Sequence, residues 1–151
     1  IDAMNRLRTN AENLKKDMID KLDGMRAAVD YIEEISPELV EEYRRKLTDK
    51  ITEVLDNPVI DENRIATEGV IYADKICVDE ETVRLKSHIS STKKILEDGG
   101  SVGRKLDFIA QEMNREANTI LSKANSLDVS DKAIQLKTDI EKVREQIQNL
   151  E

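Results

Sequence analysis

Two glutamates one helical turn apart are the residues of this sequence best suited to chemistry. Glu112 and Glu116 are separated by four residues, so a helix would present both carboxylates on one face. His88, the only histidine, or Asp107 would complete a set of ligands suited to Mg²⁺ or Mn²⁺. Such an ion would polarise a phosphate oxygen and lower the pKa of a bound water. We therefore take all four as candidate catalytic residues, and His88, Glu112 and Glu116 as candidate metal ligands.

The segment 103–123, which carries both glutamates, also has an unusual polar surface. Its apolar residues recur at helical spacing and predict a helix packed against others. Beside that stripe stand Asn, Ser and Thr, which form helices less readily than Ala, Lys or Glu. They could bind a ligand or form hydrogen bonds between helices, and both explanations stay open. The polar residues are Asp107, Gln111, Glu112, Asn114, Glu116, Asn118, Thr119, Ser122 and Lys123.

The charge of the chain is unevenly distributed. The formal net charge is −8, which at first argues against a nucleic-acid ligand. The window 84–105, however, carries six basic and two acidic residues, so its net charge is +4 and the remainder carries −12. Such a strip can guide a polyanion to one face of an acidic protein. Alternatively, Lys93 and Lys94 only complement the C-terminal end of a helix.

The position of His88 makes a shared site plausible. It lies in a predicted helix, 80–97, which Gly99 and Gly100 end, and a short turn separates that helix from 103–123. If the two helices are antiparallel, His88 lies roughly 16 Å from the turn, at a level similar to Glu112 or Asn114. We expect His88, Glu112 and Glu116 to converge in one metal-sized pocket, with Asp107 or Glu81 nearby.

The composition predicts an all-α fold. Charged residues make up 37% of the chain and aromatic residues 3%, and no alternating strand pattern flanked by tight turns is found. We expect an elongated bundle of about six long, antiparallel helices. The expected parts are a long N-terminal helix 1–34, a bundle 36–125, and a C-terminal heptad helix 130–151.

Sequence signals set the expected helix boundaries within the bundle. Ser36 as N-cap and Pro37 at the first helical position would restart the chain after the N-terminal helix. The break at 57–58 would end that second helix, Asp61 would cap the third, and Asp79 the fourth. Asp128 or Ser130 would cap the last helix.

The first and last helices carry narrow apolar seams. Their apolar residues recur at alternating steps of three and four, which is typical of helices that pair with one or two long partners. We expect a homo-oligomer, although pairing of the two helices within one molecule explains the seams equally well.

Several blocks of the sequence, in order, resemble the C-terminal part of the YicC/YloC family of bacterial endoribonucleases. They are RLKSH at 84–88, GRKLDFIAQEMNREANTILSK at 103–123 and QLKTDIEKVREQIQNLE at 135–151, with weaker similarity over the rest of the chain. The resemblance implies a metal-dependent, homo-oligomeric enzyme that encloses RNA, and a separate N-terminal domain before this region. The residues expected to contact RNA are Arg84, Lys86, Arg104, Lys105, Gln111, Asn114, Arg115, Asn118 and Lys123.

Two alternatives remain at this point. In a metal-free reaction, His88 would act as general base on the ribose 2′-hydroxyl, and an arginine would stabilise the phosphorane. In a non-enzymatic role, the chain would be an oligomerisation scaffold or an RNA-binding adaptor. No apolar run approaches the roughly 18 residues of a membrane span and no signal peptide is recognisable, so we expect a cytoplasmic protein without membrane contact.

Overall fold

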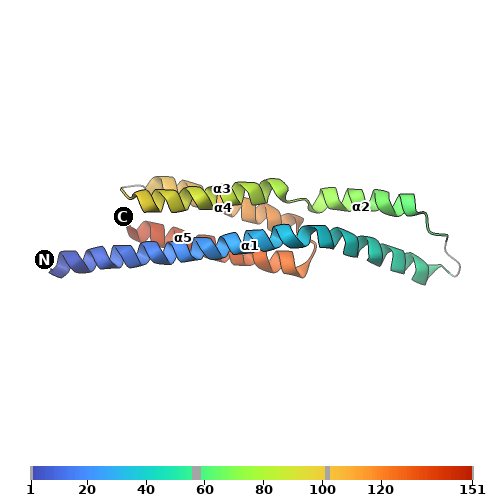
Figure 1. Ribbon diagram of the computed structural model, residues 1–151, viewed down its shortest axis with the longest axis horizontal. Helices are drawn as coiled ribbons and strands as arrows, with labels where there is room; N and C mark the ends of the chain where they lie inside the picture. Colours follow the sequence, from blue (N-terminus) through green and yellow to red (C-terminus); the bar gives the residue numbers. More distant parts are fainter. Residues whose placement is uncertain (1, 56–58, 101–102, 151) are drawn as a thin grey trace.

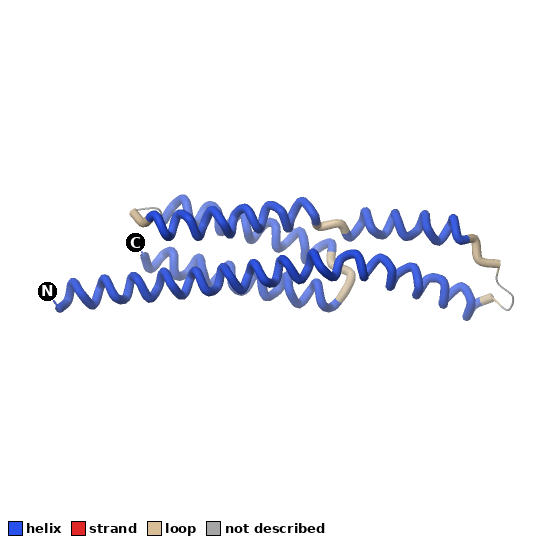
Figure 2. Tube along the Cα trace, viewed as in Figure 1, coloured by secondary structure: helices blue, strands red, loops and turns tan. Residues whose placement is uncertain are grey.

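The computed structural model describes residues 2–55, 59–100 and 103–150, and in those ranges it contains helices and no strand (Figures 1 and 2). The prediction of an elongated all-α bundle is therefore confirmed. Five helices are described, fewer than the six expected. They are α1 (Asp2–Val54), α2 (Glu62–Ile76), α3 (Asp79–Asp98), α4 (Gly103–Lys123) and α5 (Leu127–Leu150).

Helix α1 runs along the whole molecule and organises the other helices (Figure 1). Its 53 residues span about 80 Å at 1.5 Å per residue. It packs against α2, α3 and α5, while α4 packs against α3 and α5. One half of the molecule is therefore a four-helix bundle of α1, α3, α4 and α5. In the other half α1 and α2 form a two-helix arm. Both chain ends lie at the bundle end.

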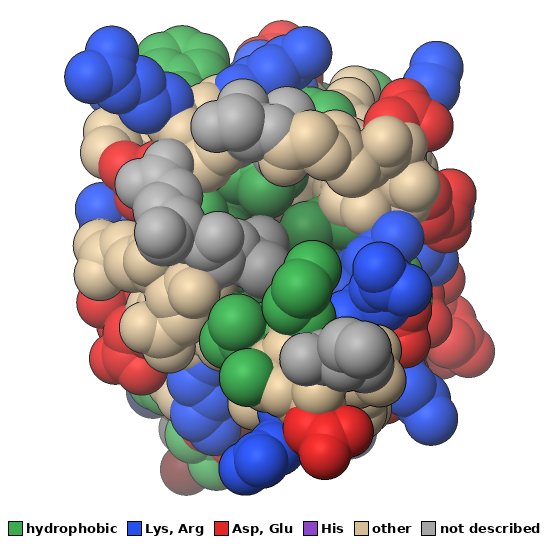
Figure 3. All heavy atoms as spheres, turned by 90° about the vertical axis from the view of Figure 1, so that its left-hand side faces the viewer, with side chains coloured by type: hydrophobic (Ala, Val, Ile, Leu, Met, Phe, Trp, Pro, Cys, Tyr) green, Lys and Arg blue, Asp and Glu red, His purple; other side chains and the backbone are tan. Residues whose placement is uncertain are grey.

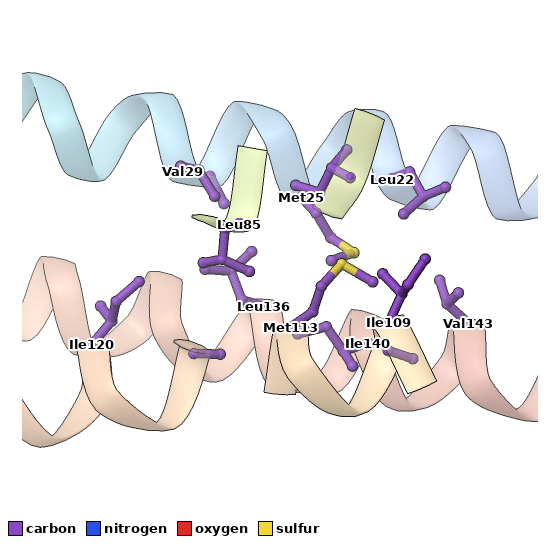
Figure 4. Packing of buried hydrophobic residues seen from close by; sticks show 14 of the residues in the cluster. Leu22, Met25, Val29, Leu85, Ile109, Met113, Ile120, Leu136, Ile140 and Val143 are labelled. Atoms are coloured by element: carbon purple, nitrogen blue, oxygen red, sulfur yellow. The ribbon is translucent and has the colours of Figure 1, made fainter. Parts of the chain in front are cut away.

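The core has the same sequence spacing on all four bundle helices: the buried positions alternate between steps of three and four residues. Met25 of α1 and Met113 of α4 point toward each other at its centre (Figure 4). Since each helix is apolar on one side only, none of those described is long and apolar enough to cross a membrane. The buried residues of this pattern are Met18, Leu22, Met25, Val29 and Ile32 on α1, Leu85, Ile89, Thr92 and Leu96 on α3, Leu106, Ala110, Met113, Ala117 and Ile120 on α4, and Val129, Ala133, Leu136, Ile140, Val143 and Ile147 on α5.

The predicted restart at Ser36 and Pro37 is wrong, because α1 continues through both residues to Val54. Pro37 removes one backbone hydrogen bond and is exposed, while Ile35 and Leu39 on either side pack against the core. This packing carries the helix across the proline, and Figure 1 shows α1 changing direction past its middle. The predicted helix 1–34 and the first helix of the bundle 36–125 are thus one element.

The other predicted boundaries were correct in part. Asp61 caps α2 by accepting hydrogen bonds from the backbone N–H groups of Asn63 and Arg64, as expected. Asp79 is instead the first residue of α3, after Val78, whose side chain makes no capping hydrogen bond. Helix α5 begins at Leu127, not at 130, because the Ser126 hydroxyl accepts a hydrogen bond from the backbone N–H of Val129 and supplies an earlier cap. The predicted break at 57–58 lies outside the described residues.

The apolar seams of α1 and α5 are buried to different extents. That of α5 is buried against α1 and α4 of the same chain, as the intramolecular explanation predicted. That of α1 is buried from Met18 to Ile32, whereas Met4 and Leu7 remain 69% and 70% exposed.

Candidate functional site

An ion pair between α3 and α4 is the centre of the candidate site. The Nε group of Arg84 donates a hydrogen bond to Oε1 of Glu116 at 2.8 Å. The Glu116 side chain is 8% exposed and that of Arg84 is 48% exposed. The hydrogen bond to Glu116 is the largest cause of a raised pKa for Arg84. A buried carboxylate therefore orients a guanidinium that still reaches solvent.

A second ion pair lies beside the first. Lys123 of α4 contacts Glu81 of α3 at 3.0 Å, and also donates to the carbonyl oxygen of Cys77 at 3.1 Å. The hydrogen bond to Glu81 is the main reason that the pKa of Lys123 is raised. Glu81 also lies 4.0 Å from Arg84, and its second oxygen has no hydrogen-bond partner among the described residues. The polar residues of α4 on this side thus bind α3.

The predicted metal ligands share one interface without forming one pocket. His88 lies one turn beyond Arg84 on α3 and Glu112 one turn before Glu116 on α4, so antiparallel packing puts His88 and Glu112 at the same level. Both are half-buried. In the described part of the chain, however, no three His, Cys, Asp or Glu side chains are grouped so that they could hold a metal ion. The expected convergence of His88, Glu112 and Glu116 is not found, since Glu116 turns to Arg84. These residues alone do not fit a three-ligand metal centre.

Of the two carboxylates expected near this pocket, Glu81 lies on the Arg84 side, whereas Asp107 lies on the opposite flank of α4. It accepts hydrogen bonds from Gln111 at 3.0 Å and from Arg144 of α5 at 3.1 Å. The reason is helical geometry, because nine residues at 100° each place Asp107 half a turn around the helix from Glu116. Asp107 thus fixes α4 to α5.

Apart from Arg84 and Lys94, the basic residues of the window 84–105 divide into two groups. Lys86 contacts Glu33 of α1 at 2.5 Å and Asp30 at 3.5 Å, and Lys93 contacts Asp23 of α1 at 2.6 Å. These contacts hold α3 to α1, and the hydrogen bond to Glu33 is the main cause of the raised pKa of Lys86. Arg104 and Lys105 at the start of α4 are exposed instead.

Viewed from the end of the bundle, basic and acidic side chains alternate around the rim and hydrophobic side chains show near the centre (Figure 3). This end of the bundle is therefore of mixed charge, and within the window 84–105 the pairing of Lys86 and Lys93 with acidic residues of α1 reduces the excess positive charge.

The side of α4 that faces away from its neighbours forms a continuous exposed row, called the outer face of α4 below. Its members recur at steps of four and three residues, so they line one side of the helix. Asn114 is half-buried and lies beside this row. The exposed members are Arg104, Phe108, Gln111, Arg115, Asn118 and Ser122.

Residues 32–151 match the family described as "Endoribonuclease YicC-like, C-terminal". The chain belongs to this family. It is 44% identical over 155 residues to the "Probable endoribonuclease YicC" of Clostridioides difficile (strain 630), covering 99% of this chain and 53% of that protein. It is 39% identical over 140 residues to the protein of the same name from Haemophilus influenzae (strain ATCC 51907 / DSM 11121 / KW20 / Rd), covering 93% and 48%. The chain thus spans about half the length of these relatives.

One residue of this YicC-like region was missed by reasoning from the sequence. Phe108 is 63% exposed in the middle of the outer face of α4, where the sequence predicted only polar side chains. Two signals could have found it. It is the only phenylalanine of the chain, and its four- and three-residue spacing from Arg104 and Gln111 places all three on one side of the helix.

Proposed function

We propose that this chain is the RNA-contacting and RNA-cleaving part of an endoribonuclease, with α3 and α4 facing the RNA. The names of the two relatives support this class of reaction. The observation that carries the proposal is the Arg84–Glu116 pair, in which a buried carboxylate orients the guanidinium. The two terminal nitrogens of Arg84 lie 3.6 Å from Glu80 and 4.0 Å from Glu81, beyond hydrogen-bond distance, so they can still bind a phosphate.

The proposed chemistry uses residues that lie one turn apart. His88, as general base, takes the proton of a ribose 2′-hydroxyl, and the 2′-oxygen attacks the adjacent phosphorus. The bond to the 5′-oxygen breaks, and this oxygen leaves with a proton from solvent. The products are a 2′,3′-cyclic phosphate and a 5′-hydroxyl end. Arg84 stabilises the negative charge of the phosphorane, and Glu116 positions Arg84.

Assistance by a divalent metal ion stays a prediction. Because the described residues offer no three-ligand group, Mg²⁺ or Mn²⁺ near Glu112 would have to complete its coordination with water and RNA phosphate oxygens. Magnesium commonly binds proteins through only one or two carboxylates in this way.

Partners beyond RNA also belong to the proposal. The exposed Met4 and Leu7 continue the buried seam of α1, and this supports packing of that end against another helix, from a second copy in a homo-oligomer or from an N-terminal domain. The length of the relatives supports the presence of such a domain in the whole protein. We also propose that the whole protein acts in the cytoplasm.

The decisive experiment incubates full-length protein with a short single-stranded RNA, with and without EDTA, and identifies the 3′ ends of the products. We expect cleavage by the wild type and at least a tenfold loss in Arg84→Gln. Arg45→Gln, an exposed arginine of the arm, is the control. Cyclic phosphate ends formed in EDTA support the histidine reaction, and loss of cleavage in EDTA supports the metal.

Two results contradict the proposal. If the purified wild-type protein binds RNA without cutting it, the chain is an adaptor. If Arg84→Gln cuts at the wild-type rate, the proposed site is wrong.

A further inference from the structure

Phe108 is an exposed aromatic ring that the fold does not use. The three tyrosines all have partners, since Tyr43 and Tyr72 stack with ring centroids 4.0 Å apart and Lys132 lies over the ring of Tyr31 at 5.0 Å. In the described part of the chain, no such stacking or cation–π contact involves Phe108, which remains 63% exposed. A Phe at a solvated helical position also forms helix less readily than Lys or Glu would.

Positively charged residues flank this ring along the outer face of α4. Arg104 lies one turn before Phe108, and Arg115 lies two turns after it. Within the described ranges Arg104 forms no ion pair, and Arg115, 75% exposed, only approaches Glu112 at 4.0 Å. The two arginines are about 16 Å apart along the helix axis, which corresponds to about five stacked nucleotides at 3.4 Å each.

The rest of the outer face also fits nucleic acid better than protein. Gln111, Asn118 and Ser122 are uncharged hydrogen-bonding groups, so the face carries two positive charges and no negative one in a chain of net charge −8. Phe108 is the only large exposed hydrophobic residue described on α4. The buried centre of a protein interface is usually more apolar than such a surface.

We propose that Phe108 is a stacking platform for an unpaired base of single-stranded RNA, with Arg104 and Arg115 holding the phosphates on either side. This inference rests on the proposed function and specifies its substrate, because only an unpaired base leaves its face free for an aromatic side chain. Stacking accepts any base, so the platform gives affinity for unpaired RNA without strong sequence preference.

The test measures binding of full-length protein to a single-stranded RNA containing 2-aminopurine, whose fluorescence reports stacking, and to the same RNA in a duplex. We expect Phe108→Ala to weaken single-strand binding by about 5- to 100-fold and to abolish the fluorescence change. Phe108→Tyr should keep both. Phe108→Leu, which keeps apolar bulk without a ring, should behave like Phe108→Ala. Val70→Ala, at an equally exposed apolar position on α2, is the control.

The possible results distinguish failure of the stacking proposal from failure of the proposed endoribonuclease function. If Phe108→Ala or Phe108→Leu binds single-stranded RNA as tightly as the wild type, Phe108 is not a stacking platform. The proposed function is not affected by that result. A change of oligomeric state in Phe108→Ala, measured by sedimentation, also overturns it and shows that Phe108 packs against a second copy. A wild-type protein that binds no RNA removes the proposed function itself.

Discussion

Glu116 accepts a hydrogen bond from Arg84 across the α3–α4 interface, and the acceptor is almost completely buried while the donor is half exposed. This difference in exposure indicates different roles for Glu116 and Arg84. A buried anion does not meet a phosphate, but it fixes the direction of the cation that does. Glu116 is therefore a positioning residue rather than a metal ligand in the function proposed above.

Glu116→Gln should reduce cleavage by at least about tenfold through kcat, with little change in KM. The amide keeps the shape of the side chain but no longer holds Arg84 by charge, and the removal of an anion does not weaken binding of RNA. Steady-state cleavage assays of the full-length protein test this. Glu80→Gln is the matched control, because Glu80 is 82% exposed and lies 3.6 Å from the same arginine. Equal losses in both variants would argue against a special role for Glu116.

Arg104→Gln and Arg115→Gln should each flatten the salt dependence of RNA binding. Each phosphate contact releases counterions, so the loss of one contact changes the slope of log K against log [salt] by about 0.7 for a single strand. Titrations at several salt concentrations measure the slope, with Arg45→Gln on the arm as control. If the slope stays at the wild-type value, the outer face of α4 does not contact phosphates.

Lys86→Met should destabilise the protein at neutral pH, and the effect should fade at high pH. The ion pair with Glu33 raises the pKa of Lys86, so its contribution is fully present below the unfolded pKa of about 10.5 and is lost as the pH rises through the higher folded value. Denaturant unfolding of wild type and variant at pH 8 and above pH 11 measures the difference. Lys94→Met, at an exposed position of α3, should show no such trend. The RNA salt slope of Lys86→Met should also match that of the wild type, because Lys86 serves the fold.

Pro37→Ala should stabilise the protein by about 1–3 kcal/mol, because proline inside a continuous helix lacks one hydrogen bond and clashes with the preceding turn. Urea denaturation at fixed protein concentration measures the change. Glu38→Ala, at the adjacent exposed position, is the control. An unchanged free energy of unfolding would instead fit a helix that starts at Pro37, where proline is favourable.

Much of the fold could be predicted because helical periodicity is a local signal. The stripe of 103–123, the end of α3 at Gly99 and the cap at Asp61 all follow from residues a few positions apart. The continuity of α1 through Pro37 could not, since it depends on Ile35 and Leu39 packing against helices distant in sequence.

The candidate site was predicted at the level of helices but not of side chains. Antiparallel packing, with Arg84 bonded to Glu116, puts His88 at about the level of Glu112 on the neighbouring helix. The spacing of Glu112 and Glu116 does not reveal that Glu116 forms an ion pair with Arg84. Nor does the sequence around Lys86 reveal its ion pair with Glu33. Whether a charge is free for a ligand is decided by partners on other helices.

The packing of α5 against α1 has a consequence for synthesis on the ribosome. The apolar row from Met18 to Ile32 is synthesised well before α5, the helix that covers it on one side. At ordinary rates of translation, α5 is completed on the order of ten seconds after this apolar row has been synthesised. During this interval the nascent chain exposes the apolar side of a long helix, which is the kind of surface that chaperones bind. Premature termination before α5 would leave the same surface exposed in a product prone to aggregation.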